Sequence, residues 1–387
     1  MESNVATPLA VDHAFRGELK RYGLIDNNLC YHCGTCTATC GLTEEGSLFP
    51  RQEIRSVQLG LKEKLGNSVE PWLCYYCGEC SSRCPREANP AEQMMTLRRY
   101  LTACYDWTGL SAKLNTSLGW HLGFLGLVSA VVVGLFAGYH LLHPGQIVWD
   151  LRDGYVHLNS FAPVSLIHRA DLLLGAILSF FLLSNIYRMY RKILLSDKNL
   201  KIPFSLYLKK LWTLPTHFAT QLRFSKCDKK WNYWVAHFFL MSGYALMFYL
   251  IMLNLASFQL EQGVNWTTGI GYYCTFGLFY GTGVCIVGRW RKTDENHKYS
   301  HFTDWTFLLL LFFTTLSGIL LHLFRYWLAW PAATYYMYVI HLAIDVPMLI
   351  VMVPFSKWSH LAYRPLAIYF AEIRKAALVA GNLGGIR

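Results

Sequence analysis

The sequence lacks the motifs that would place it in a common class of soluble enzyme. No nucleotide-binding glycine fingerprint stands out, because Gly281-Thr-Gly283 lies inside an apolar run, where small residues serve helix packing. No hydrolytic constellation of side chains stands out either. Residues 1–20 carry no apolar segment behind a basic start, so we expect no secretory signal. These absences direct attention to the cysteines and the apolar runs.

Acidic residues are scarce: 24 Asp and Glu stand against 35 Lys and Arg, which gives a formal net charge of +11. Such a charge can indicate nucleic-acid binding. Here, however, the Lys and Arg residues lie in connectors between apolar runs, where membrane topology places them. Hydrophobic residues make up 53% of the chain, which is high for a soluble protein. We therefore expect a membrane, and no nucleic acid, as a partner.

Eight of the twelve cysteines form two runs of identical spacing, C-x2-C-x2-C-x3-C, at residues 30–40 and 74–84. This spacing holds [4Fe–4S] clusters in two-cluster ferredoxins, where three close thiolates bind one cluster and the fourth completes the other. Two clusters are therefore predicted. The first is assigned to Cys30, Cys33, Cys36 and Cys84, and the second to Cys74, Cys77, Cys80 and Cys40.

Zinc and disulfides are the competing interpretations of these cysteines. Zinc needs only four ligands in paired C-x2-C units, so two complete four-Cys runs disfavour it. Disulfides are disfavoured because a chain without a signal suits metal ligation in a reducing compartment. The remaining cysteines are interpreted as buried, inert thiols; they are Cys104, Cys227, Cys274 and Cys285.

The segments around the cysteine runs predict helices. Apolar residues at helical spacing predict a helix over 50–65. Asn89-Pro90-Ala-Glu92 has the composition of an N-cap followed by a proline at the first helical position, and the helix it starts is expected to run through Leu101. The N-terminal part is thus predicted to be a helical two-cluster ferredoxin module.

Six apolar runs follow, each long enough to cross a hydrocarbon core of about 30 Å. The connectors over 188–230 and 289–301 are rich in Lys and Arg, so the positive-inside rule places them, and both termini, in the cytoplasm. The cysteine module then also lies in the cytoplasm, in agreement with its thiolate chemistry. The runs are 118–143, 161–190, 232–258, 266–289, 302–328 and 333–356.

Histidines inside apolar helices are costly and commonly functional. His237 enters the third run from the cytoplasmic side, at about the depth expected for His360 beyond the last run. We predict these two as axial ligands of one haem b near the iron–sulfur module. His341 precedes His360 by about 28 Å of helix, at 1.5 Å per residue, so it lies towards the outer leaflet.

His341 needs a second axial partner from the outer side. His168 and His322 both come from that side, and His168 is favoured slightly because Asp171, one turn later, is placed to orient it. Three further histidines near the interfaces are weaker candidates: His121, His140 and His301.

Asp345 lies one turn from His341, where an ionisable side chain inside the membrane indicates function. We predict that it takes or gives a proton as quinone is reduced or quinol is oxidised. The alternative is a salt bridge to Arg169 or Arg325.

The predicted fold class is all-α, with a ferredoxin module followed by a transmembrane bundle. Residues 1–115 are assigned to a cytoplasmic iron–sulfur domain, 116–365 to a six-helix transmembrane haem b domain and 366–387 to a cytoplasmic tail.

These motifs are similar to those of known families. The twin Cys runs, with Cys84-Pro85 and the Asn-Pro-Ala-Glu helix, resemble the iron–sulfur C subunit of heterodisulfide reductases. The last five runs, ending in Pro354-Phe-Ser-Lys-Trp-Ser-His360, resemble the cytochrome b (gamma) subunit of respiratory nitrate reductase and the related membrane subunit of heterodisulfide reductase. A chain that fuses the two modules resembles the membrane subunits of quinone-interacting membrane-bound oxidoreductases.

That resemblance implies electron exchange between menaquinol and adenylylsulfate (APS) reductase in sulfate reduction, at the cytoplasmic (inner) membrane. It implies partner subunits that contain flavin and iron–sulfur clusters and are similar to the A subunit of heterodisulfide reductase (HdrA-like). It also implies two b haems, with His237 and His360 as the proximal ligands and His341 as one distal ligand.

The sequence departs from this family pattern twice. The other distal ligand is expected ten residues after His237, where the chain has Met247; Met247, His168, His322 and a missing second haem all stay open. The spacing from His341 to His360 also exceeds the family's by one residue. Because Pro347 lies between them, we predict a kink or π-bulge there that absorbs the slip.

The favoured function is therefore a respiratory electron conduit of quinone, haem b and two [4Fe–4S] clusters. Two alternatives stay open: a heterodisulfide- or methanophenazine-linked subunit, and a membrane anchor or redox sensor with structural clusters.

Overall fold

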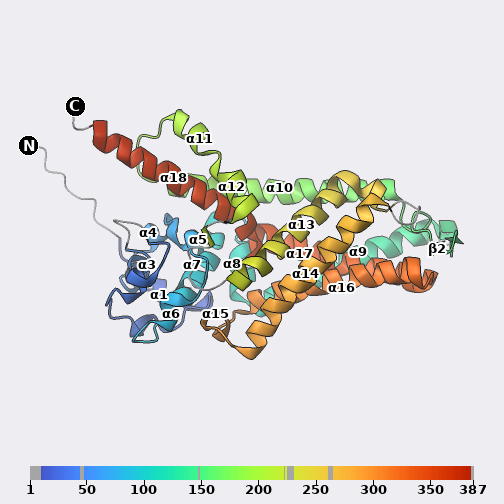
Figure 1. Ribbon diagram of the computed structural model, residues 1–387, viewed down its shortest axis with the longest axis horizontal. Coiled ribbons are helices and arrows are strands. Elements are labelled where there is room, and N and C mark those ends of the chain that lie inside the picture. The colour runs from blue at the N-terminus through green and yellow to red at the C-terminus, as the bar shows by residue number, and fades with distance from the viewer. Residues whose placement is uncertain are drawn as a thin grey trace, which may run out of the picture.

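The computed structural model describes residues 10–43, 48–146, 149–221, 223–224, 231–259 and 265–384. The molecule is elongated, with a small helical head at one end and a bundle of long helices along its axis (Figure 1). Within the described residues the only sheet is the short hairpin of β1 (Leu151–Arg152) and β2 (Tyr155–Val156), at the end opposite the head. The predicted all-α class is confirmed in this part of the chain.

The head consists of short helices around one apolar core. Phe15, Ile54, Val57 and Met94 are fully buried in it, and each such side chain contributes about 1.5–3 kcal/mol. The elements of the head are α1 (Phe15–Arg21), η1 (Asn27–Leu29), α2 (Thr35–Thr39), α3 (Arg51–Gln58), α4 (Lys62–Gly66), α5 (Glu70–Leu73), α6 (Glu79–Ser82), α7 (Pro90–Tyr105) and α8 (Leu110–Thr116).

Two of the predicted head helices differ in detail from the structure. The helix expected over 50–65 is two helices, because Gly60 adopts φ +67° and its Cα lies against the Asp12 backbone, where a side chain would collide. The helix predicted to start at Pro90 is confirmed as α7. Asn89 does not cap it with its side chain, which instead donates to Asp26 at 2.8 Å.

The six predicted apolar runs are confirmed as six helices long and apolar enough to span a membrane. Large apolar side chains such as Leu135, Leu173 and Leu253 are exposed on them, as expected of a lipid-facing surface. These features make the chain a multi-pass membrane protein. The helices are α9 (Leu118–Leu142), α10 (Val164–Leu194), α13 (Trp231–Phe258), α14 (Trp266–Arg291), α16 (Phe302–His322, extended by a π turn over Leu323–Trp327) and α17 (Pro331–Phe355).

Of the kink or π-bulge predicted at Pro347, the π-bulge is wrong and the kink stays a prediction. The α-helix α17 is continuous from Pro331 to Phe355, and the chain breaks instead at Ser356, which has φ −142° and ψ −144°. The Asn115 and Asn185 side-chain amides donate to the carbonyls of Phe355 and Pro354, at 2.9 and 3.1 Å, so the end of α17 is satisfied from outside the helix.

His360 therefore begins a new helix instead of continuing the last membrane helix. The turn η5 (Lys357–Ser359) leads from the break into α18 (His360–Gly384), which runs back along the head (Figure 1). The boundary expected at residue 365 falls inside α18. This break removes the continuous helix expected between His341 and His360.

A buried aromatic cluster joins the head to the bundle. Trp72 of α5 and Tyr105 of α7 pack edge-on against Tyr363 of α18, with ring centroids 5.2 and 5.5 Å from it, and Met189 of α10 belongs to the same core. The remaining short helices connect the long ones. They are η2 (Pro144–Gln146), α11 (Phe204–Lys210), α12 (Thr213–Thr220) and α15 (Glu295–Lys298).

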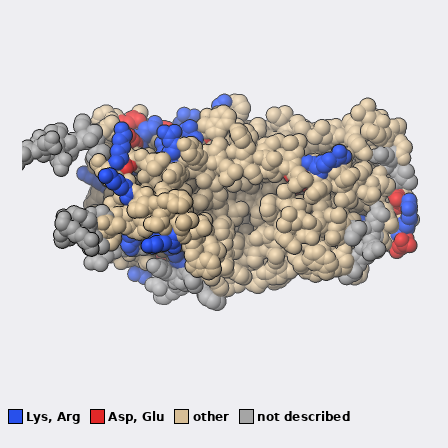
Figure 2. All heavy atoms as spheres, turned by 90° about the horizontal axis from the view of Figure 1, so that it is seen from above, with Lys and Arg blue, Asp and Glu red and all other residues tan. Residues whose placement is uncertain are grey.

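Charge is distributed unevenly along the molecule. Figure 2 shows Lys and Arg gathered mainly at the end that carries the head, while most of the visible bundle surface is uncharged. This pattern is the one that the positive-inside rule associates with the cytoplasmic side.

Candidate functional site

The two cysteine runs share one backbone conformation. His32 and Tyr76, the residues before the second cysteine of each run, have φ of 59° and 57°. Gly34 and Gly78, which follow that cysteine, have φ of 87° and 88° and start α2 and α6. Each loop thus turns twice through the left-handed region.

The eight thiols fall into two neighbourhoods that interleave the runs. Cys30 interacts electrostatically with Cys84 and Cys33, and Cys36 with Cys30 and Cys33. In the second neighbourhood, Cys80 interacts most strongly with Cys74 and Cys77, and Cys40 interacts with Cys77. Helices α2 and α6 pack together, which brings the fourth cysteine of each run to the other. The exchanged pairing of the fourth cysteines stays a prediction from the spacing.

The second neighbourhood surrounds a cavity of about 60 Å³, lined by Cys40, Cys74, Cys77 and Cys80. Nowhere in the described part of the chain do three His, Cys, Asp or Glu side chains converge on a position for one metal ion. Four cysteine thiols around one cavity are the donor set that a [4Fe–4S] cluster takes.

Local donors point at several of these sulfurs. The Tyr76 amide donates to Cys74 Sγ at 3.3 Å, and the Ala88 amide donates to Cys84 Sγ at 3.4 Å. The Thr35 side chain lowers the pKa of the Cys33 thiol, whereas burial raises that of Cys36 to about 11. Hydrogen bonds favour the thiolate and burial opposes it, and bound iron would supply the missing positive charge.

His237 and His360 line a second cavity of about 250 Å³, between the head and the bundle. The His237 Nδ1–H donates to Gln221 Oε1 at 2.8 Å, and the His360 Nδ1–H donates to the Lys357 carbonyl at 2.7 Å. These bonds leave Nε2 of both rings as the unprotonated nitrogen, the form that a metal ligand needs. Burial lowers the pKa of His360 well below its usual value, which also favours the neutral imidazole.

The walls of this cavity suit a flat apolar ring system that carries carboxylates at its edge. Phe224 stacks on His237, with ring centroids 6.2 Å apart. Arg98 and Arg364 both donate to the Cys74 carbonyl, and burial, followed by repulsion from Arg364, lowers the pKa of Arg98 to about 9. Two adjacent buried guanidinium groups attract carboxylates such as haem propionates. Two neutral imidazoles, aromatic walls and cations together fit a bis-His haem.

The histidine cavity also reaches the second cysteine run, because Tyr76 and Cys77 lie in its wall. A haem held there would lie next to the second cluster. The sequence predicted a haem near the iron–sulfur module, but the contact with the second cysteine run in particular depends on how the head packs on the bundle.

Sequence reasoning missed several residues of the cavity. His217 of α12 lines it, and burial lowers the pKa of this imidazole to about 4. Gln221, Arg98 and Arg364 were missed because they come from connectors or from the head and α18. His217 was missed because it lies in a basic connector, where a histidine is not unusual, and not in an apolar run.

The residues predicted for the outer site lie elsewhere. The His341 ring packs on α16, with Nδ1 2.9 Å from Ser317 Oγ. His168 interacts electrostatically with Asp171 on its own helix. His322 Nε2 is 2.8 Å from the Tyr272 hydroxyl. None of these histidines, nor Met247, lines the cavity of His237 and His360.

The three weaker candidates have local partners. His121 Nδ1 lies 3.0 Å from the Leu114 carbonyl, His140 stacks on Phe161 with centroids 4.4 Å apart, and His301 caps α16 through Thr303. Cys227 lies outside the described residues.

Asp345 of α17 lies within electrostatic range of another carboxylate. It interacts electrostatically with Asp171 of α10, and Tyr244 interacts with Asp345 in turn. The two arginines considered as salt-bridge partners bond to carbonyls: Arg169 to Ser165 at 3.0 Å and Arg325 to Val156 at 3.0 Å.

Comparison with known proteins identifies the head. A family model described as "4Fe-4S dicluster domain" matches residues 26–88. The chain is 34% identical over 90 residues to a protein of Archaeoglobus profundus described as similar to the C subunit of heterodisulfide reductase, an alignment that covers 23% of this chain and 48% of that protein. It is 33% identical over 86 residues to the C subunit of the H(2):CoB-CoM heterodisulfide,ferredoxin reductase of Methanothermobacter thermautotrophicus, covering 22% and 46%.

A third relative is an iron–sulfur C subunit of the CoB--CoM heterodisulfide reductase of Methanocaldococcus jannaschii, 41% identical over 69 residues, with 18% of this chain and 37% of that protein covered. The chain thus spans about half the length, or less, of the curated relatives it matches. No solved structure matches. The N-terminal part is therefore a 4Fe–4S dicluster domain similar to iron–sulfur subunits of oxidoreductases, and it is joined to six helices able to span a membrane.

Proposed function

We propose that this chain is a membrane electron-transfer subunit that passes electrons between quinone, haem b and two [4Fe–4S] clusters. The observation that carries the proposal is the shared cavity, which is lined by His237 and His360, whose Nδ1 atoms are held by hydrogen bonds, and by Cys77 of the second cysteine run. A haem bound there supplies one-electron redox chemistry. The chain's own side chains orient the imidazoles, balance the propionate charge and exclude water.

The clusters are proposed to sit on Cys30, Cys33, Cys36 and Cys84, and on Cys74, Cys77, Cys80 and Cys40. The second cluster adjoins the haem cavity, whereas Cys33 of the first is exposed. Electrons would then cross from the bundle through the second cluster to the first, where a soluble partner docks. The domain limits at 115 and 365 and the cytoplasmic placement of both termini belong to this proposal.

The partner and the quinone follow from the resemblance. The curated relatives are named as C subunits of heterodisulfide reductases or as similar to one. The resemblance of this chain to a fusion of such a subunit with a cytochrome b bundle favours flavin- and iron–sulfur-containing partners, menaquinone and a link to APS reductase. The proposed outer site comprises His341, with His168, His322 or Met247 as its partner, and Asp345 is proposed to exchange protons with quinone.

Cofactor content tests the proposal. We expect the purified full chain to contain b haem by pyridine haemochrome assay and about eight non-haem irons. His237→Ala should lose one haem and keep all the non-haem iron, and His341→Ala should lose one haem if the outer site is filled. Wild-type protein with full iron but no haem would contradict the conduit and favour a membrane anchor with structural clusters.

A further inference from the structure

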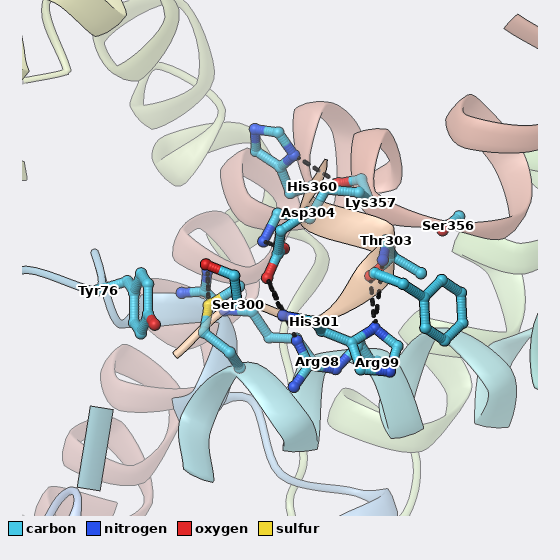
Figure 3. A network of polar contacts seen from close by, with 12 residues as sticks. Tyr76, Arg98, Arg99, Ser300, His301, Thr303, Asp304, Ser356, Lys357 and His360 are labelled. Carbon is cyan, nitrogen blue, oxygen red and sulfur yellow. Dashed lines mark hydrogen bonds and ion pairs between the residues drawn. The ribbon is translucent and has the colours of Figure 1, made fainter. Parts of the chain in front are cut away.

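A chain of buried polar contacts runs from the second cysteine loop to His360 (Figure 3). In the head, the Tyr76 hydroxyl donates to Glu92 Oε2 at 2.6 Å, and Glu92 Oε1 accepts from Arg99 Nη2 at 2.8 Å. Tyr76 lies between Cys74 and Cys77, so the series of polar contacts begins in the loop of the second cysteine run.

Asp304 of α16 connects the head to the bundle. Its Oδ2 lies 3.8 Å from Arg99 Nη1, and its Oδ1 forms an ion pair with Lys357 Nζ. The Lys357 carbonyl in turn accepts the Nδ1–H of His360 at 2.7 Å. One carboxylate therefore holds both the head arginine and the residue that orients a proposed haem ligand.

Stability alone is a weak reason for this arrangement. The side chains of Asp304, Arg99 and Glu92 are each at most 5% exposed, and desolvating such charges costs as much as their attraction returns, or more. Buried ion pairs of this kind serve best to set a specific register between parts. Here the parts are a cluster loop and a haem ligand.

The charge around Asp304 is unbalanced. Lys357, Arg289 and Arg99 all act on its single carboxylate. Arg289 and Lys357 also line the histidine cavity. Asp304 thus decides how much net positive charge a group bound between His237 and His360 would feel.

We infer that Asp304 is a positioning residue that sets the potential of the proximal haem and fixes the second cluster loop relative to His360. The inference rests on the proposed function, because it requires a haem at His237 and His360. Removing the carboxylate raises the net positive charge beside the histidine cavity, which stabilises the reduced haem. Removing Lys357 does the opposite.

The test measures the midpoint potential of the proximal haem by redox titration of the purified full chain, together with the low-spin EPR signal of the ferric haem. In Asp304→Asn we expect the ratio of reduced to oxidised haem at a fixed potential to rise about tenfold, which equals about 59 mV for one electron. Lys357→Met should shift the potential the other way, and Asp304→Glu should restore it.

A matched control is Asp150→Asn, which breaks the ion pair of Asp150 with Arg152 at the opposite end of the bundle and should leave the potential unchanged. General damage to the fold would move Asp304→Asn and Lys357→Met in the same direction, and that result, or no shift in either, overturns the inference. If Asp304→Asn does not accumulate, the sign of the Lys357→Met shift decides alone. Wild-type protein without haem overturns the proposed function instead, and this inference with it.

Discussion

Gln221 is the residue that orients His237 in the histidine cavity. Its Oε1 accepts the Nδ1–H of His237 at 2.8 Å, and its own side chain is buried. Such partners fix the tautomer and the plane of a ligating imidazole, and losing one typically costs 10–100-fold in affinity for the metal.

We expect Gln221→Leu to weaken retention of the proximal haem by about that factor while the non-haem iron content stays unchanged. Haem loss to a competing apoprotein, followed by absorbance, measures the effect. Exposed Gln52 in α3 supplies a control, and Gln52→Leu should behave as wild type. Equal haem loss from wild type and Gln221→Leu would contradict the role of the Nδ1 bond.

Asp345 is the residue on which the proposed quinone chemistry depends most. Its carboxylate interacts with that of Asp171 across the contact between α10 and α17. An ionisable side chain inside a membrane is a candidate proton donor or acceptor. A proton held there is available to a reduced quinone.

Asp345→Asn is expected to lower quinol turnover by roughly 10²–10⁴-fold, the usual contribution of a positioned proton donor or acceptor, and to flatten its pH dependence. Haem and iron contents should stay at the wild-type level, which separates proton transfer from assembly. Normal turnover and an unchanged pH profile in Asp345→Asn would remove this residue from the mechanism, and Asp171→Asn would then be tested in the same assay.

Close packing of α13 against α14 positions the element that carries His237. A side chain at Gly277 would approach the Phe239 carbonyl to 2.6 Å, and one at Gly281 would come within 2.6 Å of Leu240 Cβ. Small residues that let two helix backbones approach in this way are typical of membrane interfaces. The packing meaning assigned to the glycines of this run is therefore correct for Gly281.

Gly277→Ala should separate α13 from α14 and displace His237, so we expect weaker haem retention and a lower midpoint temperature of unfolding in detergent. Its destabilisation should be about 1–3 kcal/mol, as for overpacking in a core. Gly283→Ala is the matched control, because nothing lies within 4 Å of its added Cβ. Identical behaviour of the two variants would show that the helix contact does not position His237.

The sequence predicted the long helices better than the places where the chain turns between helices. Apolar run length and the basic connectors were enough to predict six spanning helices, since both reflect the solvent around each segment. The break at Ser356 was not predicted, because it depends on Asn115 and Asn185 reaching the end of α17 from other helices. The same limit applied at Gly60, whose turn depends on contact with Asp12.

Across the whole molecule, the candidate cofactor sites lie in the head and at its contact with the bundle. The pair of His237 and His360 was predicted from depth in the membrane, and the cysteine grouping from spacing alone. The arginines around them were not predicted, because Arg98 and Arg364 meet only when the head docks on α18. The spacing of residues in the sequence predicts ligands that lie within one segment. The positive charges around those ligands come together only when the head packs on α18.

The proposed positions of the two clusters predict the route that electrons take. The second cluster shares a cavity with the haem ligands, whereas Cys33 of the first is exposed and Tyr31 beside it is 70% exposed. Quinol should therefore reduce the first cluster only through the second.

In Cys80→Ser, which removes a ligand of the second cluster, we expect quinol to reduce the haem but to leave the first cluster oxidised, as followed by rapid-freeze EPR. In Cys33→Ser the haem and the second cluster should both still be reduced, because the lesion lies beyond them. Fast reduction of the first cluster in Cys80→Ser would mean that electrons reach the tip of the head by another path, and that the shared cavity is a structural contact.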